Sequence, residues 1–228
     1  PRDVILARAA EMDAPVRLMG RDFSYTLSGP PEALEFSFET PLVKLGPTPL
    51  GLVGRFQGHN AAIAVTLALD LVPRYPKITA KAIETGLSEV CWPCRMERVL
   101  DDPPVFIDVA HNPMGAKKLA AELEPGYVVV VGCSKDKDVP GIVEGLAPIA
   151  KTFVVTRFEG ERAMTVERLA EIVGSYPHCQ TPNLTEGLAR AFEIAGGKDP
   201  ILVTGSVFTS GEARRILIER YGARPLRF

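Results

Sequence analysis

Residues 108–113 combine a carboxylate, an imidazole and an amide in the segment Asp-Val-Ala-His-Asn-Pro. The apolar run before this segment predicts a strand that ends at Asp108, and open α/β sheets bind ligands at the carboxyl ends of their strands. A carboxylate there can accept two hydroxyl hydrogens, as from a ribose. Asn112 and Pro113 have a simpler explanation, because asparagine caps helices and proline suits the first helical position. The cap requires neither Asp108 nor His111, so these two residues are candidates for binding.

A second candidate is Arg95, in the segment Trp92-Pro93-Cys94-Arg95-Met96-Glu97. The planar guanidinium of arginine matches the geometry of phosphate oxygens and keeps its charge. A surface ion pair with Glu97 is the alternative explanation for this arginine. The local sequence leaves both explanations open.

A third candidate is Asn60, in the segment Gly54-Arg55-Phe56-Gln57-Gly58-His59-Asn60. An asparagine amide donates and accepts hydrogen bonds at once, which suits the edge of an adenine base. Asn60 is equally well explained as the N-cap of the apolar helix expected after it. His59 beside it is more often a structural histidine than a ligand.

The elements expected from residue 98 onward alternate between short apolar strands and amphipathic helices. Residues 127–131 are rich in valine, which a strand buried on both faces of a sheet requires. The expected strands span residues 105–108, 127–131, 152–155, 178–180 and 201–203. The expected helices span about residues 113–123, 139–149, 166–173, 184–195 and 211–221. This alternation predicts right-handed β-α-β units and one Rossmann-like α/β domain with a parallel sheet in residues 98–228.

The part of the chain before residue 98 has a different pattern. Its expected elements are a helix at 4–11, a strand at 16–19, short antiparallel segments at 23–27 and 35–38, and helices at 60–71 and 79–90. Residues 16–19 are the one convincing parallel strand for these helices to cover, which indicates the rear part of a larger domain. Residues 101–104, Asp-Asp-Pro-Pro, form a turn and a natural hinge. We therefore expect two domains, residues 1–97 and 98–228.

The composition argues against several classes of protein. The 228 residues carry a formal net charge of -2, which disfavours the large basic face of a nucleic-acid-binding protein. No run of about 18 apolar residues is present, so we expect no membrane span. Four irregularly spaced cysteines favour reduced thiols in a cytoplasmic protein over a disulfide scaffold. No targeting signal is visible at Pro1, and this residue need not be the native start.

Taken together and in this order, the three candidate segments resemble the folylpolyglutamate/dihydrofolate synthases of the Mur ligase superfamily. The resemblance covers nearly the whole chain. The segment around Asp108 is shared with other Mur ligases, whereas the tryptophan-proline-x-arginine sequence points to the folate branch. The motifs that carry the resemblance are Gln57-x-x-Asn60, Trp92-Pro93-x-Arg95-x-Glu97, Asp108-x-Ala110-His111-Asn112-Pro113, Asp136-Lys137-Asp138 and Gly205-Ser206.

The resemblance implies an ATP-dependent ligase that joins glutamate to the carboxylate of a pteroate or folate through an acyl phosphate, with Mg²⁺ as cofactor. It implies the rear part of a P-loop-type ATPase domain in residues 1–97 and a Mur-ligase C-terminal Rossmann-like domain in residues 98–228. The residues that it assigns to ATP are Asn60 at the adenine, Arg95 at the phosphates and Asp108 at the ribose. The residues that it assigns to the incoming glutamate are His111, Lys137 and Ser206. It assigns no catalytic residue and no metal ligand within this chain.

Two departures from the family pattern matter. The family usually has glycine at the position of Cys94, and no phosphate-binding G-x-x-x-x-G-K-[ST] loop occurs in this sequence. The segment Gly196-Gly197-Lys198 fails that pattern. The family carries the loop, most magnesium ligands and most of the folate site in the half that would precede Pro1. We therefore expect this chain to be inactive alone and to act with an N-terminal half.

Three other interpretations stay open. Cys91-Trp92-Pro93-Cys94 is a C-x-x-C pair, but it follows an expected helix instead of opening one, and no second pair completes a zinc site. A non-catalytic nucleotide-binding module or a nucleotide-dependent oxidoreductase is compatible with the Rossmann-like domain, although no G-x-G-x-x-G follows an expected strand. Another Mur-type amino-acid ligase is the third, although the aspartate-asparagine-proline-arginine box of the muramyl-peptide ligases is missing.

Overall fold

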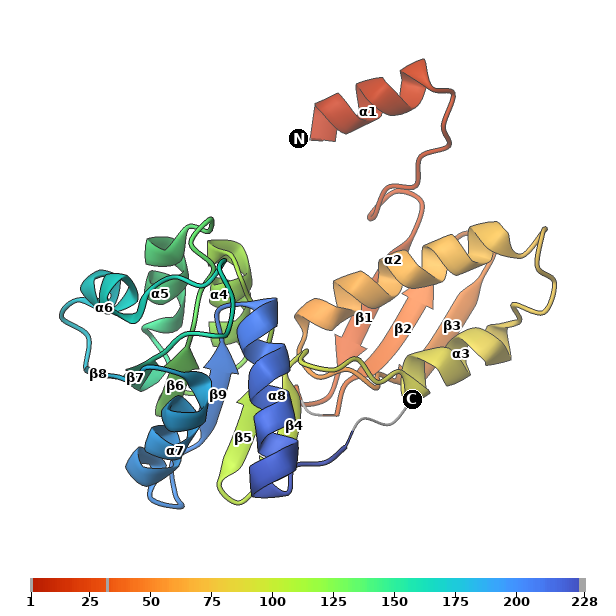
Figure 1. Ribbon diagram of the computed structural model, residues 1–228. Helices are drawn as coiled ribbons and strands as arrows, with labels where there is room; N and C mark the ends of the chain where they lie inside the picture. The colour runs from red at the N-terminus through yellow and green to blue at the C-terminus, as the bar shows by residue number, and fades with distance from the viewer. Residues whose placement is uncertain (1, 32, 226–228) are drawn as a thin grey trace. The chain divides into compact units, whose positions relative to one another are not determined.

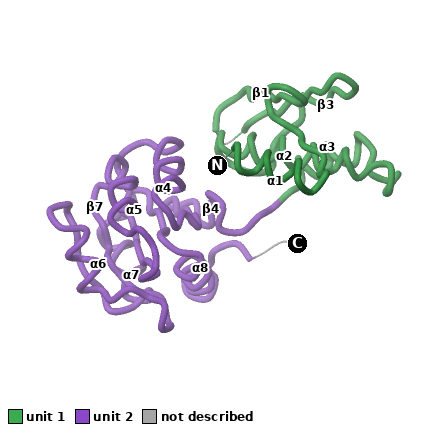
Figure 2. Tube along the Cα trace, turned by 90° about the horizontal axis from the view of Figure 1, so that it is seen from above, with its two compact units in different colours: residues 1–90 green, residues 91–228 purple. Residues whose placement is uncertain are grey.

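The computed structural model describes residues 2–31 and 33–225. The chain folds into two compact units, residues 1–90 and residues 91–228, which Figure 2 shows in green and purple. This boundary lies before the one expected between residues 97 and 98. Cys94 and Met96 are buried, Cys94 within the core of the second unit, and the N–H of Val109 donates to the carbonyl of Cys94 at 3.0 Å. The segment around Arg95 therefore packs as part of the second unit.

The second unit is built on a six-stranded mixed sheet with the order β4-β5-β9-β6-β7-β8. Its strands are β4 (Glu97–Asp101), β5 (Pro104–Ile107), β6 (Tyr127–Val131), β7 (Ala150–Val155), β8 (His178–Gln180) and β9 (Ile201–Thr204). All neighbours pair in parallel except β4, which runs antiparallel to β5. The expected α/β fold and its parallel sheet are therefore confirmed. The sequence did not predict β4, an edge strand that forms a hairpin with β5 across the expected turn at residues 101–104.

Helices cover both faces of this sheet. In the described part of the second unit they are α4 (Pro113–Ala120), α5 (Val139–Leu146), α6 (Val166–Val173), α7 (Leu184–Ala195) and α8 (Val207–Tyr221). The chain crosses from β5 to β6, β7 and β8 in one direction and returns from β8 to β9 in the other. Because such crossovers are right-handed, α4, α5 and α6 lie on one face and α7 on the opposite face, where α8 packs beside it (Figure 1). All five residues of β6 are buried between these layers.

Helix α8 begins at Val207, ahead of the start expected at Gly211. Ser206 explains the earlier start, because its hydroxyl oxygen accepts a hydrogen bond from the N–H of Phe208 at 3.2 Å and so caps the helix. Ser206 itself directly follows Gly205, whose φ of 104° lets the chain turn sharply out of β9. The loop between β9 and α8 is thereby reduced to two residues.

Helices α4 and α5 approach each other closely because glycine occupies contact positions of α5. A Cβ atom at Gly145 would lie 2.9 Å from the Cβ of Ala116, and one at Gly141 would lie 2.6 Å from Cγ of Pro113. Helix α5 is capped by Asp138, whose carboxylate accepts from the N–H of Gly141 at 3.1 Å. This packing fixes the first turn of α4 and with it the loop that follows β5.

The first unit contains a three-stranded antiparallel sheet with two helices packed against it, and an N-terminal helix without buried residues. Its strands are β1 (Ser24–Ser28), β2 (Glu35–Glu39) and β3 (Lys44–Pro49), and its helices are α1 (Arg2–Glu11), α2 (Phe56–Leu71) and α3 (Ala80–Glu89). The antiparallel segments expected at residues 23–27 and 35–38 are confirmed. Phe36 and Phe38 of the sheet share one buried core with Ala62 and Val65 of α2 and Ile83 of α3. The sequence did not predict that α2 and α3 would pack against this antiparallel sheet of their own unit.

The parallel strand expected at residues 16–19 is wrong. Met19 makes only an isolated bridge to Phe23. Asp22 turns the chain there instead, because its carboxylate accepts hydrogen bonds from the guanidinium of Arg21 and from the N–H of Leu18, both at 2.7 Å. These two hydrogen bonds, the one from Arg21 first, lower the pKa of Asp22 to about 2. A charged turn thus occupies the place of the expected strand.

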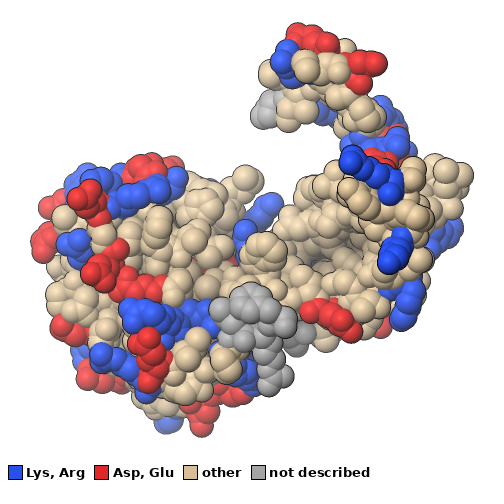
Figure 3. All heavy atoms as spheres, turned by 45° about the vertical axis from the view of Figure 1, so that its right-hand side comes forward, with Lys and Arg blue, Asp and Glu red and all other residues tan. Residues whose placement is uncertain are grey.

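The surface carries mixed charges. On the face shown in Figure 3, acidic and basic side chains of the larger unit are interspersed, in keeping with the net charge of -2. Within residues 2–31 and 33–225, no helix combines the length and the apolar character that a membrane crossing needs.

Candidate functional site

The loops after β5, β9 and β6 carry Asp108, His111, Ser206 and Lys137, whereas Arg95 lies in the turn before β4. These three strands are neighbours and run parallel, so their carboxyl ends meet at one edge of the sheet. The N–H of Gly205 donates to the carbonyl of Ala110 at 3.1 Å, which joins the β9 and β5 loops. The hydroxyl oxygens of Ser134 and Ser206 lie 3.4 Å apart, which joins the β6 and β9 loops. The fold therefore brings the three loops together.

Asp108, the first residue after β5, is buried, with 4% of its surface exposed. One carboxylate oxygen accepts from the N–H of Ala110 at 2.8 Å, and the other accepts from the N–H of Met96 at 2.9 Å. Burial raises the pKa of this carboxyl above its usual value, although the two N–H groups and, to a smaller extent, Arg95 and His111 oppose the shift. The carboxylate therefore links its own loop to the turn that contains Arg95.

Arg95 is exposed and lies between two buried residues, Cys94 and Met96. Both neighbours have left-handed backbone conformations, with φ of 59° at Cys94 and 47° at Met96. Glycine adopts this conformation most readily, which agrees with the glycine that the resemblance leads us to expect at the position of Cys94. The left-handed pair presents the Arg95 side chain to solvent.

The alternative in which Arg95 pairs with Glu97 is wrong. The carboxylate of Glu97 is occupied by Arg214 of α8, whose Nη2 lies 2.6 Å from Oε1 and whose Nε lies 2.9 Å from Oε2. Burial disfavours a charged Glu97, but the hydrogen bonds from Arg214 and from the N–H of Cys94 outweigh it, so the pKa of Glu97 is lowered. In the described part of the chain, Arg95 takes part in no ion pair.

His111 and Asn112 connect β5 to α4. The imidazole Nδ1 of His111 lies 2.9 Å from the carbonyl oxygen of Val109, which leaves Nε2 for another partner. The side chain of Asn112 accepts from the N–H of Gly115 at 2.8 Å, and Pro113 is the first residue of the helix. The capping role predicted for Asn112 and Pro113 is therefore confirmed.

Lys137 and Ser206 lie in the loops after β6 and β9. The ammonium of Lys137 lies 3.1 Å from a carboxylate oxygen of Asp136, and the guanidinium of Arg162 approaches the same carboxylate at 3.3 Å. Ser206 is buried and already caps α8. No hydrogen bond joins Lys137 to His111 or Ser206 among the residues that the structure describes. The structure thus places these three residues on neighbouring loops without direct bonds between them.

Asn60 belongs to the first unit. Helix α2 begins at Phe56, so Asn60 lies inside the helix and the alternative in which it caps that helix is wrong. Its side-chain N–H donates to Oε1 of Gln57 at 2.8 Å. The Asn60 side chain keeps its carbonyl oxygen and its second N–H for other partners, since the residue is exposed.

Sequence reasoning missed the polar residues that support this site. Ser210 of α8 donates to the carbonyl of Asp108 at 2.8 Å and to that of Ser206 at 2.9 Å. Arg214, one helical turn further, is 5% exposed. Ala213, Ile216 and Leu217 around it form the apolar side of the helix. The available sequence signal was an arginine among the apolar residues Ala213, Ile216 and Leu217 of one helix.

The cysteine pair shows no sign of thiolate chemistry. Burial raises the pKa of Cys94 to about 11, and Cys91 is exposed. Reactive cysteines have lowered pKa values, so Cys94 packs as an apolar side chain. In residues 2–31 and 33–225, no group of three or more His, Cys, Asp or Glu side chains is arranged to hold a metal ion.

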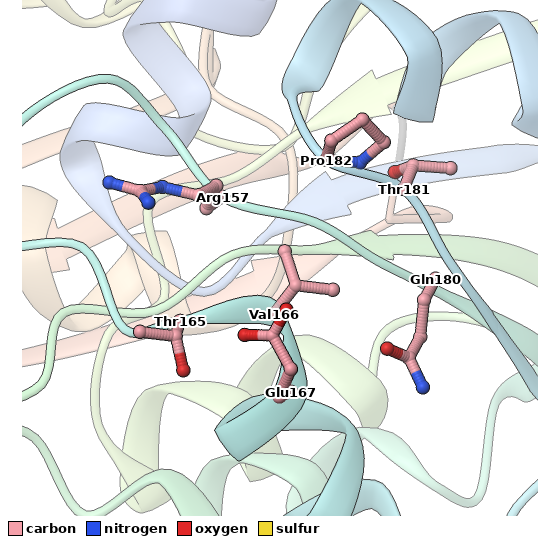
Figure 4. Close-up of a pocket in the computed structure, with 7 residues that line it drawn as sticks. All are labelled: Arg157, Thr165, Val166, Glu167, Gln180, Thr181 and Pro182. Atoms are coloured by element: carbon pink, nitrogen blue, oxygen red, sulfur yellow. The ribbon is translucent and has the colours of Figure 1, made fainter.

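A cavity of about 390 Å³ lies at the carboxyl ends of β7 and β8 (Figure 4). The residues that line it are Arg157, Thr165, Val166, Glu167, Gln180, Thr181 and Pro182. In Figure 4 the guanidinium of Arg157 extends away from Gln180. None of the candidate residues lines this cavity, so the sequence motifs and the cavity mark different parts of the same sheet edge.

Comparison with models of protein families shows to which family the chain belongs. A family model described as Mur ligase, glutamate ligase domain, matches residues 94–207, half of the chain. The chain belongs to the Mur ligase family. The match extends from the turn of Arg95 to the beginning of α8, and it includes the loops after β5, β6 and β9.

Two similar proteins have the same name. The dihydrofolate synthase/folylpolyglutamate synthase of Mycobacterium tuberculosis is 34% identical over 191 residues, covering 73% of this chain and 39% of that protein. The enzyme of the same name from Bacillus subtilis is 29% identical over 196 residues, covering 82% and 45%. This Mur ligase chain thus spans about half the length of the curated relatives it matches.

Solved structures show the same relationship. Mycobacterium tuberculosis folylpolyglutamate synthase complexed with ADP matches with a TM-score of 0.85 and 29% identity, covering 99% of this chain and 53% of that one. Escherichia coli FolC in complex with DHPP and ADP matches with a TM-score of 0.83 and 27% identity, covering 96% and 51%. The fold of this chain is therefore that of part of these enzymes.

The raised pKa of Asp108 predicts a pH-dependent difference between the wild type and Asp108→Asn. A carboxyl with a raised native pKa stabilises the fold fully below its ordinary value of 3.8, and this contribution is lost as the pH rises through the native value. We therefore expect the wild type to gain stability relative to the variant when the pH falls from about 7 to about 4. At the lower pH the variant should be less stable by about 1–3 kcal/mol, because one N–H loses its acceptor.

Urea unfolding at the two pH values measures this difference. Asp102→Asn is the control, because Asp102 is exposed, and it should stay within about 0.5 kcal/mol of the wild type at both values. A difference between the wild type and Asp108→Asn that does not change with pH would contradict the raised pKa.

Proposed function

We propose that this chain is the glutamate-ligase half of an ATP-dependent enzyme that adds glutamate to dihydropteroate or folate. The observation that carries the proposal is the match of a glutamate ligase domain to residues 94–207, within which Arg95, Asp108 and Lys137 lie. The names of the similar proteins supply the substrate class. In this reaction ATP phosphorylates the folate carboxylate to an acyl phosphate and leaves as ADP. The amine of glutamate then attacks the acyl carbon, an amide bond forms, and inorganic phosphate leaves.

For ATP, we assign the phosphates to Arg95, the ribose to Asp108 and the adenine to Asn60. The exposed guanidinium of Arg95 fits a phosphate in charge and geometry. Each oxygen of the Asp108 carboxylate retains one lone pair beyond its bond to a backbone N–H, which suits a ribose hydroxyl. The exposed amide of Asn60 keeps both a donor and an acceptor. The ADP in the solved relatives supports a nucleotide at these residues.

For the metal, we propose Mg²⁺. A related enzyme from Yersinia pestis, 25% identical, was solved with AMPPNP and a Mn ion. The described residues of this chain offer no cluster of metal ligands. We therefore assign the magnesium ligands mainly to the remaining half of the enzyme.

For glutamate, we assign Lys137, Ser206 and His111. Lys137 offers a positive charge to a carboxylate of the amino acid, in competition with its neighbour Asp136. His111 offers Nε2, because Nδ1 is held by the carbonyl of Val109. Ser206 lies on the loop after β9, which is directly beside both β5 and β6.

The remaining half of the enzyme is the second part of the proposal. We assign residues 1–97 to the rear part of a central ATPase domain, whose phosphate-binding loop would lie in a preceding half, joined or separate. The relatives are about twice as long as this chain. Three apolar side chains on the solvent side of α2, at Ile63, Leu67 and Leu71, are 42%, 59% and 47% exposed and recur every four residues, as a covered helix face would. Four free cysteines support a cytoplasmic location.

We expect no ligation by this chain alone, because the sequence lacks the G-x-x-x-x-G-K-[ST] loop that holds the β- and γ-phosphates. A ligation assay with ATP, glutamate and dihydropteroate measures this directly. The control is the same assay with a complete relative such as the Mycobacterium tuberculosis enzyme. Turnover by this chain without a partner would contradict the assignment of the phosphate-binding loop to another half.

The glutamate assignment predicts a selective effect of Lys137→Ala. Glutamate titrated into this chain should shift the amide NMR signals of residues 137 and 206, and the variant should weaken this binding about tenfold, because a charge-assisted hydrogen bond is lost. Lys135→Ala is the matched control, since Lys135 is an exposed lysine of the same loop, and it should bind glutamate as the wild type does. Equal weakening by both variants would show only a general charge effect, and no change in either would remove Lys137 from the site.

A further inference from the structure

The turn that carries Arg95 is strained. Cys94 and Met96 both adopt left-handed conformations, which cost residues with a Cβ atom roughly 1–2 kcal/mol each. Such conformations persist where the surrounding structure fixes them, and they cluster at functional sites. Contacts with the surrounding structure must therefore hold Cys94 and Met96 in these conformations.

Three hydrogen bonds hold this turn. The carbonyl of Cys94 accepts from the N–H of Val109 at 3.0 Å, and the N–H of Met96 donates to Asp108 at 2.9 Å. The third runs from the N–H of Cys94 to Oε2 of Glu97, also at 2.9 Å. The first two bonds come from the β5 loop, whereas the third depends on where the side chain of Glu97 is held.

Arg214 holds Glu97 from helix α8. Its Nε lies 3.2 Å and 2.9 Å from the two carboxylate oxygens and its Nη2 lies 2.6 Å from Oε1. The two side chains are 6% and 18% exposed. A guanidinium that contacts both oxygens fixes the plane of the carboxylate as well as its place. The acceptor for Cys94 is thereby set by a residue 117 positions away in the chain.

A largely buried ion pair such as Arg214–Glu97 contributes little to the stability of a fold. Removing two charges from water costs about as much as their attraction returns, and apolar replacements of the same size are often neutral or stabilising. The Arg214–Glu97 pair is better explained by its geometry than by stability. Oε2 of Glu97 accepts a hydrogen bond from Arg214 and a second one from the N–H of Cys94 in the strained turn.

We propose that Glu97 and Arg214 are positioning residues that hold the Arg95 guanidinium in the orientation that phosphate binding requires. The proposal rests on the assignment of Arg95 to the phosphates of ATP. Neither residue touches the nucleotide; Arg214 orients Glu97, Glu97 holds Cys94, and Cys94 sets the direction of Arg95.

The test compares ATP with adenosine, because only ATP carries the phosphates. Both are titrated into the full chain and followed by the amide NMR signals of residues 94–97, which detect millimolar binding. Arg95→Ala should weaken ATP about tenfold and leave adenosine unchanged. The apolar pair Glu97→Leu/Arg214→Met should keep the fold, with unchanged signals for β6, and should lose the same preference for ATP.

A double-mutant cycle separates positioning from a general structural effect. In the variant with the apolar pair, adding Arg95→Ala should cause no further loss of ATP affinity, because the Arg95 side chain is already misplaced. Arg168→Met is the control, since it breaks the exposed Arg168–Glu171 pair on α6, and it should bind ATP as the wild type does. Arg214→Lys keeps the positive charge but loses the contact with both carboxylate oxygens, so its ATP affinity should fall about threefold. This variant serves in place of the apolar pair if the apolar pair does not fold.

Failure of the positioning role and failure of the phosphate assignment would give different results. If Arg95→Ala weakens ATP but the apolar pair and Arg214→Lys bind it normally, the positioning role is overturned and the phosphate assignment stands. The second possibility is that the ratio of ATP affinity to adenosine affinity is the same in the wild type and in Arg95→Ala. In that case Arg95 does not bind the phosphates, and the positioning role of Glu97 and Arg214 is overturned as well.

Discussion

The buried carboxylate of Asp108 is the interaction on which the candidate site depends. It accepts the N–H of Ala110, which shapes the loop after β5, and the N–H of Met96, which belongs to the turn of Arg95. Because the group is buried, water cannot replace either hydrogen bond at low cost. The loop that carries His111 and the turn that carries Arg95 are therefore joined through one carboxylate.

Helix α8 is the second constraint. Ser206, Ser210 and Arg214 recur every four residues and so lie on one face of the helix. Ser206 caps the helix at the end of β9, Ser210 donates to the carbonyl of Asp108, and Arg214 holds Glu97. A row of polar side chains on the buried face of α8 thus holds three separate segments at the sheet edge. In this Mur ligase chain, α8 and its N-cap Ser206 hold the candidate site together.

The parts of this arrangement that were predictable from sequence are those with local signals. The valine run of β6, the Asn112 cap and the position of Asp108 at a strand end follow from periodicity and residue type within a few positions. The pairing of Glu97 with Arg214 does not, because the partners are 117 residues apart and Arg95 is the nearer arginine. The strand expected at residues 16–19 failed because Asp22 offered its backbone a competing turn. The alternative in which Asn60 caps a helix failed because α2 begins earlier, at Phe56.

Hydrogen exchange of the Met96 amide tests the central claim most directly. This N–H lies in a turn, where amides ordinarily exchange fast, and its protection depends on the bond to the Asp108 carboxylate. The account predicts that Met96 exchanges as slowly as the amide of Asp108, which donates to the carbonyl of Val203 beside the sheet. In Asp108→Ala the Met96 amide should exchange far faster while β6 stays protected. Exchange of Met96 in the wild type as fast as that of the exposed loop residue Gly160 would contradict it.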